Sequence, residues 1–174
     1  MNRVLALGSA QTDVGRTAFA SLAASMHEAL YAQVGFDASV SFRACATAED
    51  AAMQLAEPDV RAAFVAVPLQ PAAFDASTVR AASARLSRGA SWVIRRDTGF
   101  VGVNTMGTGC VSYLERQGYS LGGARVVVCG EGPAALATVQ AVAAAGAERI
   151  VLIDRVKQSS ERLLTRFIKD YKRL

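Results

Sequence analysis

Short apolar runs alternate along the chain with longer segments in which apolar residues recur every three or four positions. The runs are typical of buried β-strands, and the spaced segments are typical of helices that cover a sheet. Strands are expected over residues 3–8, 40–44, 62–67, 91–95, 100–103, 125–129 and 149–153. Helices are expected over residues 13–33, 48–56, 72–86, 106–117, 133–145 and 159–171. Because strands and helices alternate, the pattern predicts an α/β fold with parallel sheets covered on both faces.

Two of these helices have further local signals. Thr47 precedes Glu49 and Asp50, which predicts a threonine N-cap followed by acidic residues in the first turn. Pro58 is expected to end this helix, because proline cannot continue it. In the helix over residues 13–33 the apolar side chains repeat at the spacing of one face, and we expect that face to be buried: Phe19, Leu22, Met26, Ala29 and Leu30.

Length and composition indicate a packed protein with one domain or two small ones. The chain has 174 residues, of which 52% are hydrophobic and 20% are charged. The turn at Gly122-Gly123 and the glycine motif after it indicate a boundary near residue 105. We therefore expect an N-terminal α/β domain over residues 1–104 and a C-terminal domain over residues 105–174. No apolar run approaches the length of a membrane span, so no membrane partner is expected.

Charge and cysteine content narrow the classes of partner. The formal net charge is +4, and much of the basic surplus lies near the C-terminus. Asp154, Glu161 and Asp170 interleave with these basic residues, which argues for a solvated face and against nucleic-acid binding. The three cysteines are far apart in the sequence and form no CxxC motif, so neither a disulfide framework nor a metal site is expected. This cysteine content indicates a protein of the reducing cytoplasm. Cys45 and Cys129 lie in apolar strand-like runs, where we expect buried thiols.

The strand over residues 125–129 runs directly into a glycine-rich motif, Gly130–Ala135, with the pattern GxGxxA. This pattern is typical of a dinucleotide-binding loop when a strand precedes it and a helix follows. Gly130 allows the tight turn, Gly132 lets the backbone approach a pyrophosphate, and Ala135 is small enough for the helix to pack on the strand. Pro133 fits the first helical position, where its missing N–H group is no loss. The remaining free N–H groups and the helix dipole favour an anion.

The residues around this motif bear on the choice of dinucleotide. Asp154 lies at the end of the next strand. Its separation from Gly130 along the sequence is about that expected of an acidic residue that binds the ribose 2′-hydroxyl. Arg155 follows it and could hold a 2′-phosphate, and Glu131 puts a negative charge near the expected pyrophosphate. The cofactor is therefore NAD or NADP, with NAD preferred. The alternative interpretation is a structural glycine turn in a parallel sheet.

At this point the chain resembles a known family. Gly102–Thr105 resembles the GxNTDG segment of shikimate and quinate dehydrogenases, Gly130–Pro133 their GAGGxxxA loop, and Ile153–Arg155 their NRT segment. Upstream, Ser25–Ala29 looks like the end of their SxSPxMHNA segment, and Val65–Gln70 looks like VTxPHK. The resemblance implies an N-terminal substrate-binding-type domain, a partial Rossmann domain and an NAD(P)-dependent oxidoreductase.

The departures from the family pattern concern the substrate site. The family's catalytic lysine falls on Gln70 and its partner aspartate on Met106, and neither residue can act as a general base. Of the polar groups that the resemblance assigns to the substrate, Ser21 and Asn104 remain. The resemblance therefore implies an altered substrate, such as another small hydroxy acid or a polyol, and argues against shikimate itself.

Three hypotheses follow for the function. The first is a shikimate dehydrogenase-like oxidoreductase with a changed substrate, and the second is a non-catalytic nucleotide-binding protein. The third is an incomplete fragment of a longer dehydrogenase, because the family continues with further Rossmann strands. Without them the strand over residues 125–129 lacks a neighbour on one side, so a homo-oligomer is expected. His27 and Trp92 are expected to serve packing rather than catalysis.

Overall fold

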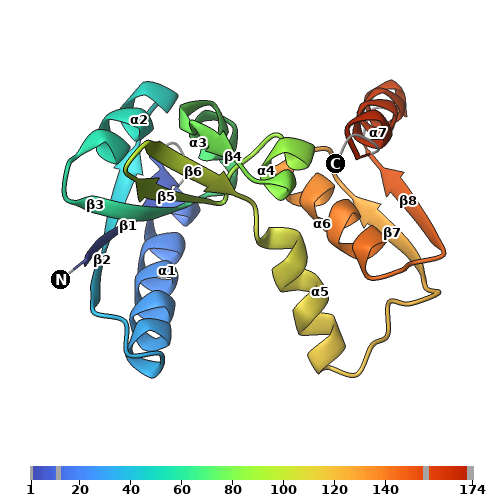
Figure 1. Cartoon of the computed structure of the whole chain (residues 1–174), viewed down its shortest axis with the longest axis horizontal. Helices are drawn as coiled ribbons and strands as arrows, with labels where there is room; N and C mark the ends of the chain where they lie inside the picture. Colours follow the sequence, from blue (N-terminus) through green and yellow to red (C-terminus); the bar gives the residue numbers. More distant parts are fainter. Residues whose placement is uncertain (1, 11–12, 155–156, 172–174) are drawn as a thin grey trace. The chain divides into compact units, whose positions relative to one another are not determined.

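The computed structural model describes residues 2–10, 13–154 and 157–171, without the side chains of residues 13–21, 157–160 and 163. The chain divides into two compact units (Figure 1). The first unit comprises Met1–Arg80 and Ala90–Gly102, and the second comprises Ala81–Gly89 and Val103–Leu174. Residues 81–89 thus group with the second unit, although the division at residue 105 placed them in the first.

The first unit contains a mixed sheet of six strands in the order β2-β1-β3-β5-β6-β4. The strands are β1 (Asn2–Ser9), β2 (Ala38–Cys45), β3 (Val60–Val65), β4 (Val79–Arg80), β5 (Trp92–Arg96) and β6 (Gly99–Val103). β1 is parallel to both β2 and β3, as expected, but β5 is antiparallel to β3. The predicted α/β fold is confirmed, and its sheet is mixed rather than parallel throughout. The main-chain carbonyl of Ser91 accepts a hydrogen bond from Val65 N–H at 2.9 Å. The strand β5 therefore begins beside the end of β3 and runs back along it in the opposite direction.

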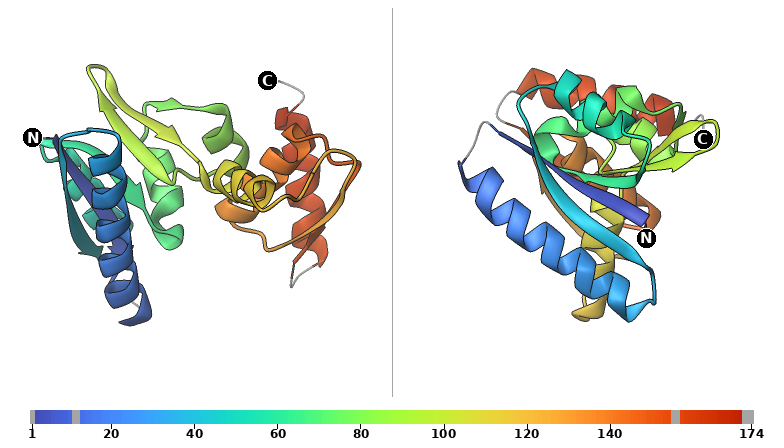
Figure 2. Two further views of the ribbon diagram at one scale, coloured as in Figure 1. Left: turned by 90° about the horizontal axis from the view of Figure 1, so that it is seen from below. Right: turned by 90° about the vertical axis from the view of Figure 1, so that its left-hand side faces the viewer.

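The long helix α1 (Asp13–Gln33) lies along β1 and β2 (Figure 2). Its predicted buried face was wrong at four positions, because Ala29 is exposed and Leu22, Met26 and Leu30 are 63%, 56% and 51% exposed. The side chain of Phe19, the fifth residue of that face, lies outside the described part of the chain. Ala23 and His27 are buried instead. The helix therefore turns a small residue and an aromatic ring towards the sheet, and its long aliphatic side chains point to solvent.

His27 is part of an aromatic cluster in the first unit. Its ring centroid lies 5.0 Å from that of Trp92 and 5.3 Å from that of Phe64. Its Nδ1 lies 2.5 Å from the carbonyl oxygen of Ala23, one turn back along α1. These contacts agree with the packing roles expected for His27 and Trp92.

Two further helices and a short 3-10 turn complete the first unit: α2 (Ala48–Ala56), η1 (Val67–Leu69) and α3 (Gln70–Ala76). The predicted N-cap of α2 is confirmed, because Thr47 Oγ1 accepts a hydrogen bond from Asp50 N–H at 3.1 Å. This bond satisfies one of the N–H groups that the first helical turn leaves without a partner.

Thr47→Ala is expected to lower the free energy of unfolding by about 1 kcal/mol, because it removes the N-cap acceptor. Urea denaturation of both proteins would measure the difference. Thr165→Ala, in the exposed middle of the last helix, is the matched control and should change stability by less than about 0.5 kcal/mol. Equal losses in the two variants would contradict a specific capping role for Thr47.

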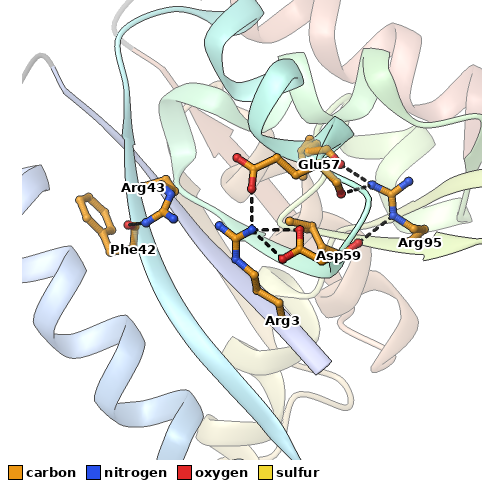
Figure 3. A network of polar contacts seen from close by, with 8 residues as sticks. Arg3, Phe42, Arg43, Glu57, Asp59 and Arg95 are labelled. Carbon is orange, nitrogen blue, oxygen red and sulfur yellow. Dashed lines mark hydrogen bonds and ion pairs between the residues drawn. The ribbon is translucent and has the colours of Figure 1, made fainter. Parts of the chain in front are cut away.

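A polar network joins β1, β3 and β5 near the end of α2 (Figure 3). Arg3 Nη1 donates to both carboxylate oxygens of Asp59 at 3.0 Å and also contacts Glu57. These carboxylates raise the pKa of the Arg3 guanidinium, with the hydrogen bond to Glu57 as the largest cause. Arg95 of β5 donates over 2.7–2.8 Å to three main-chain carbonyls, those of Leu55, Glu57 and Val60. These contacts hold the segment between α2 and β3 next to β1, through Arg3, and next to β5, through Arg95.

The segment predicted as one helix over residues 72–86 is interrupted. α3 ends at Ala76, and the chain then forms β4, where Val79 pairs with Val101 of β6. The helical structure resumes as α4 (Ala82–Ser87), which belongs to the second unit. The interruption therefore separates two helices that pack in different units.

The second unit contains a two-stranded parallel sheet made of β7 (Arg125–Cys129) and β8 (Arg149–Ile153). Its other helices are α5 (Met106–Arg116), α6 (Pro133–Ala144) and α7 (Lys157–Tyr171). One face of the sheet is buried against α4, α6 and α7, in a cluster formed by Leu86, Val128, Leu136, Val139, Leu152 and Phe167. Among the described residues, none of the helices is long and apolar enough to span a membrane.

The helices α5 and α6 approach each other closely at Gly107. A Cβ atom built on Gly107 would lie only 1.9 Å from the carbonyl oxygen of Ala137. Only glycine fits at this point, because the obstacle is main chain of the neighbouring helix.

The opposite face of the β7–β8 sheet is exposed. Val127 is 59% exposed and Ile153 is 50% exposed, and no described element covers them. Cys129 lies on the same face and is also exposed, so the expectation of a buried thiol there was wrong. Cys45, in contrast, is buried as expected, because β2 is covered by α1 and α2.

Candidate dinucleotide-binding site

The loop after β7 makes a tight turn at Gly130. This residue has a φ of +130°, a conformation that favours glycine, and its N–H donates to the carbonyl of Ile153 at 2.8 Å. A Cβ atom on Gly130 would lie 3.3 Å from the Cβ of Ala135, already a tight contact. The small residue at position 135 therefore lets α6 begin directly over the end of β7.

Gly132 is the N-cap of α6, and its carbonyl accepts the first helical hydrogen bond, from Leu136 N–H at 3.1 Å. Its φ of −82° and ψ of 179° are open to any residue, and a Cβ atom there would meet no atom within 4 Å. Nothing in the protein itself thus requires glycine at this position. Open space before the N-terminus of a helix is what a close-fitting pyrophosphate needs, and Pro133 at the first helical position leaves the following N–H groups to bind it.

A pocket of about 440 Å³ lies at the carboxyl ends of the two strands, lined by Cys129, Gly130, Glu131, Ile153 and Asp154. Ligands of open α/β sheets bind at this end of the strands. Asp154 is partly buried, with one carboxylate oxygen shielded from solvent, whereas Glu131 is exposed. The charged side chains of this lining are both acidic, which suits ribose hydroxyls better than a phosphate. Arg155 lies outside the described residues.

The two positions at which the family resemblance places catalytic groups lie in different units. Gln70 is fully buried at the start of α3, where its Nε2 donates to the carbonyl of Val65 at 3.2 Å. Met106 is the first residue of α5. Neither side chain takes up or releases a proton in the ordinary pH range.

Asn104 is buried and connects α4 with the start of α5. Its Nδ2 donates to Ser87 Oγ at 3.0 Å and to the carbonyl of Gly89 at 3.2 Å, while its Oδ1 accepts from Met106 N–H at 3.2 Å. Both amide hydrogens are thus used within the second unit. This role was not predicted from the sequence, although Ser83 and Ser87 are spaced as neighbours on one helix face and both contact Asn104. Ser21 lies in α1, and its side chain is outside the described part of the chain.

Within the described residues, no cluster of three or more histidine, cysteine or acidic side chains could hold a metal ion. The three cysteines are unpaired, and they differ in exposure. Burial raises the pKa of Cys45 to about 11, with a smaller contribution from Asp50. The thiolate is the reactive form, so Cys45 is both shielded and deactivated.

A thiol titration of the folded protein at about pH 8 should therefore show fast reaction at Cys110 and Cys129 alone, with Cys45 reacting only after denaturation. The Cys129→Ser variant should lose one fast-reacting group and keep the slow one. Fast reaction of every thiol in the native protein would contradict the buried position of Cys45.

No protein-family model matches the chain, but the chain is similar to curated shikimate dehydrogenases. The shikimate dehydrogenase (NADP(+)) of Xanthomonas euvesicatoria is 31% identical over 135 residues, which cover 71% of this chain and 48% of the relative. The chain thus spans about half the length of this curated relative and less of others.

Solved structures show the same architecture over nearly the whole chain. A shikimate 5-dehydrogenase from Thermus thermophilus, in complex with NADP(H) and shikimate, superposes with a TM-score of 0.81 at 24% identity, covering 96% of this chain and 61% of the other. A ligand-free 5-ketofructose reductase of Gluconobacter superposes with a TM-score of 0.77 at 26% identity, covering 97% of this chain and 59% of the other. The mixed α/β fold is therefore shared with these proteins.

Proposed function

The chain belongs to the shikimate dehydrogenase family, and from this premise we propose that it is an NAD(P)-dependent oxidoreductase with an altered substrate site. The observation that supports the proposal most directly is the loop between β7 and α6. Gly132 has an ordinary backbone conformation and open space before it, so the protein's own packing does not require glycine there. A close-fitting pyrophosphate would require it, and this supports the proposal.

In this proposal the dinucleotide is held by the residues of the glycine loop and by the end of β8. The N–H groups after Pro133 bind the pyrophosphate, and Gly130 and Ala135 keep the turn and the helix in place. Asp154 accepts hydrogen bonds from the ribose, and Arg155 remains a candidate neighbour of the same group. When bound, the nicotinamide supplies hydride transfer to or from a carbon atom of the substrate.

The choice between NAD and NADP rests on opposed observations. Asp154 favours an unmodified ribose, whereas the curated relatives are named for NADP(+), and this gives no support to the preference for NAD. Calorimetric titration of the whole chain with NAD⁺ and with NADP⁺ tests both the site and the choice. Micromolar binding of either one supports the proposal, and binding of neither would contradict it.

The substrate is proposed to differ from shikimate. Gln70 and Met106 replace the proton-transferring pair of the family, so the hydroxyl group of the substrate meets no titrating side chain at these two positions. Among the structural neighbours, the 5-ketofructose reductase is named for a substrate other than shikimate. We therefore propose a small hydroxy acid or polyol, bound with the help of Ser21, with Asn104 able to accept a further hydrogen bond through Oδ1.

The replacement at Gln70 also favours a second candidate, a nucleotide-binding protein without catalysis. Its amide is fully buried and donates to the main chain, in the manner of a structural residue. If the wild-type chain oxidises no hydroxy acid or polyol with NAD(P)⁺, and the double variant Gln70→Lys, Met106→Asp does, this second candidate is correct. Turnover by the wild type would exclude it.

Two further proposals accompany the function. The unpaired cysteines favour a cytoplasmic location, since such thiols persist in a reducing compartment. The uncovered β7–β8 sheet favours a homo-oligomer.

A further inference from the structure

Four basic side chains gather on two helices of the second unit, α4 and α7. Arg162, Arg166 and Lys169 of α7 line a pocket of about 430 Å³, and Arg88 at the end of α4 lies near enough to repel the Arg166 guanidinium. We call these four residues the basic cluster. The two helices pack together in the core of the unit. Among the described residues, this pocket shares no lining with the pocket at the ends of β7 and β8, so it is a separate place on the unit.

The members of the basic cluster repel one another. Arg162 and Arg166 are four residues apart on α7 and Lys169 follows three residues later, a spacing that sets like charges side by side and destabilises a helix. Burial lowers the pKa of the Arg166 guanidinium and repulsion by Arg88 lowers it further, whereas Asp170 opposes both effects. The helix dipole favours cations only in the last turn, which holds Lys169. The arrangement is therefore unfavourable in the free protein, and a bound anion would relieve it.

Two further unfavourable features meet at the same place. Of the described residues other than glycine, Arg88 alone has a positive φ, +56°, at a position where a helix usually ends in glycine. Strained main chain of this kind is often found at functional sites. The Nε atom of Arg166 is shielded from solvent, and none of the described residues accepts a hydrogen bond from it. A buried donor is normally paired, so this atom indicates a missing acceptor.

We propose that the basic cluster binds a small phosphate monoester, with its phosphate group held by Arg88, Arg166 and Lys169. Guanidinium groups form paired hydrogen bonds with phosphate oxygens, and the free Nε of Arg166 supplies one donor of such a pair. The cluster exceeds the neighbouring acids, Glu161 and Asp170, by two positive charges. A phosphate monoester carries nearly two negative charges at neutral pH, whereas a carboxylate carries one.

The remainder of the pocket indicates the organic part of the ligand. Its volume lies in the usual range for small-molecule sites and leaves room beyond a phosphate group. Thr165 Oγ1 donates to the main-chain carbonyl of Glu161 at 2.8 Å, so its oxygen is left to accept, as is the carboxylate of Glu161. Acceptors suit hydroxyl groups, and the ligand is therefore a phosphorylated sugar or polyol. No aromatic side chain lies in the described lining, which argues against a nucleic-acid strand stacked there.

Isothermal titration calorimetry of the whole chain with glucose-6-phosphate, at constant ionic strength, tests the site. The dissociation constant is expected to be below about 1 mM, and glucose should not bind measurably. Arg166→Gln should weaken the binding by about tenfold or more. Arg116→Gln removes the same charge from an exposed position on α5 and should bind as the wild type does. No binding by the wild type, or equal losses in the two variants, would overturn the proposal. Inorganic phosphate bound as tightly as the ester would overturn the part given to Glu161 and Thr165.

Arg88→Gly separates binding from folding. Glycine adopts a positive φ without strain, so the melting temperature should rise while the affinity for glucose-6-phosphate falls by about tenfold or more. Unchanged affinity in this variant would overturn a site shared by α4 and α7.

Titration with NAD⁺ and NADP⁺ distinguishes this site from the proposed dinucleotide site. Any affinity for a dinucleotide should be the same in the wild type, Arg88→Gly and Arg166→Gln. A parallel loss of dinucleotide binding would mean that the basic cluster holds a phosphate of the cofactor, and it would overturn a separate site. A chain that binds glucose-6-phosphate but neither dinucleotide would contradict the proposed function and support this inference.

Discussion

Gly132→Asp is expected to lower the affinity for the preferred dinucleotide by about 100-fold or more, equivalent to about 2.7 kcal/mol. The new side chain would occupy the open space before the N-terminus of α6 and place a carboxylate where the pyrophosphate binds. The N–H groups that would hold the phosphates would then be taken by the protein's own side chain. Isothermal titration calorimetry with NAD⁺ and NADP⁺ would measure the loss.

The same substitution should leave the fold intact, which makes the result interpretable. Aspartate is among the best N-cap residues, and Gly132 already has the extended conformation that an N-cap adopts. The melting temperature is therefore expected to stay the same or to rise slightly. Gly109→Asp, in the first turn of α5 with no atom near its Cβ position, is the matched control and should retain full affinity. Unchanged affinity in Gly132→Asp would remove the main support for a dinucleotide site.

Gly107→Ala is expected to lower the free energy of unfolding by about 3 kcal/mol or more, at the upper end of overpacking effects. The added methyl group would lie 1.9 Å from the carbonyl oxygen of Ala137, so α5 and α6 would have to separate. Main-chain atoms cannot move aside as the end of a flexible side chain can. Urea denaturation followed by circular dichroism would measure the change.

Gly109→Ala provides the opposite case on the same helix. Nothing lies within 4 Å of its Cβ position, so alanine gains helix propensity without a clash. This variant should be more stable than the wild type, by up to about 1 kcal/mol. Equal effects at the two glycines would mean that the close approach of α5 and α6 does not determine the stability of the second unit.

Local signals predicted much of this structure. The GxGxxA motif requires a strand before it and a helix after it, and β7 and α6 meet at Gly130 and Gly132 as that requirement demands. Thr47 and Asp50 are three residues apart and form the predicted cap by themselves. In each case the residues that determine the structure are close together in the sequence, so their physical chemistry can be evaluated without knowledge of the fold.

The errors arose where distant residues decide the outcome. Helical spacing identified an apolar face on α1, but the sheet beneath accepts Ala23 and His27 because Phe64 and Trp92 offer the histidine ring a packing surface. The interruption before α4 depends on pairing of Val79 with β6, a strand that comes later in the chain. The hydrogen bonds of Asn104 depend in the same way on α4.

The sequence pattern predicted one pocket better than the substrate residues. Gly130 and Glu131 follow β7, Asp154 follows the parallel strand β8, and all three line the same pocket. Binding of a dinucleotide by these residues stays a prediction. The substrate residues were assigned by resemblance to separate segments of the chain. Asn104 illustrates the limit, because the resemblance of Gly102–Thr105 assigned it to the substrate, whereas both amide hydrogens of its side chain are donated to protein atoms.

The grouping of residues 81–89 with the second unit has a consequence for how the two halves could be exchanged between proteins. Leu86 lies in the core of the second unit, and Ser87 is bonded to Asn104, yet β5 and β6 of the first unit follow them in the chain. A recombination breakpoint at residue 104 would leave the second unit without part of its core, and one at residue 80 would leave the first without two strands. During synthesis, α4 also leaves the ribosome before β5 and β6, which complete the first sheet. Neither unit can therefore complete its fold until part of the other unit has been synthesised.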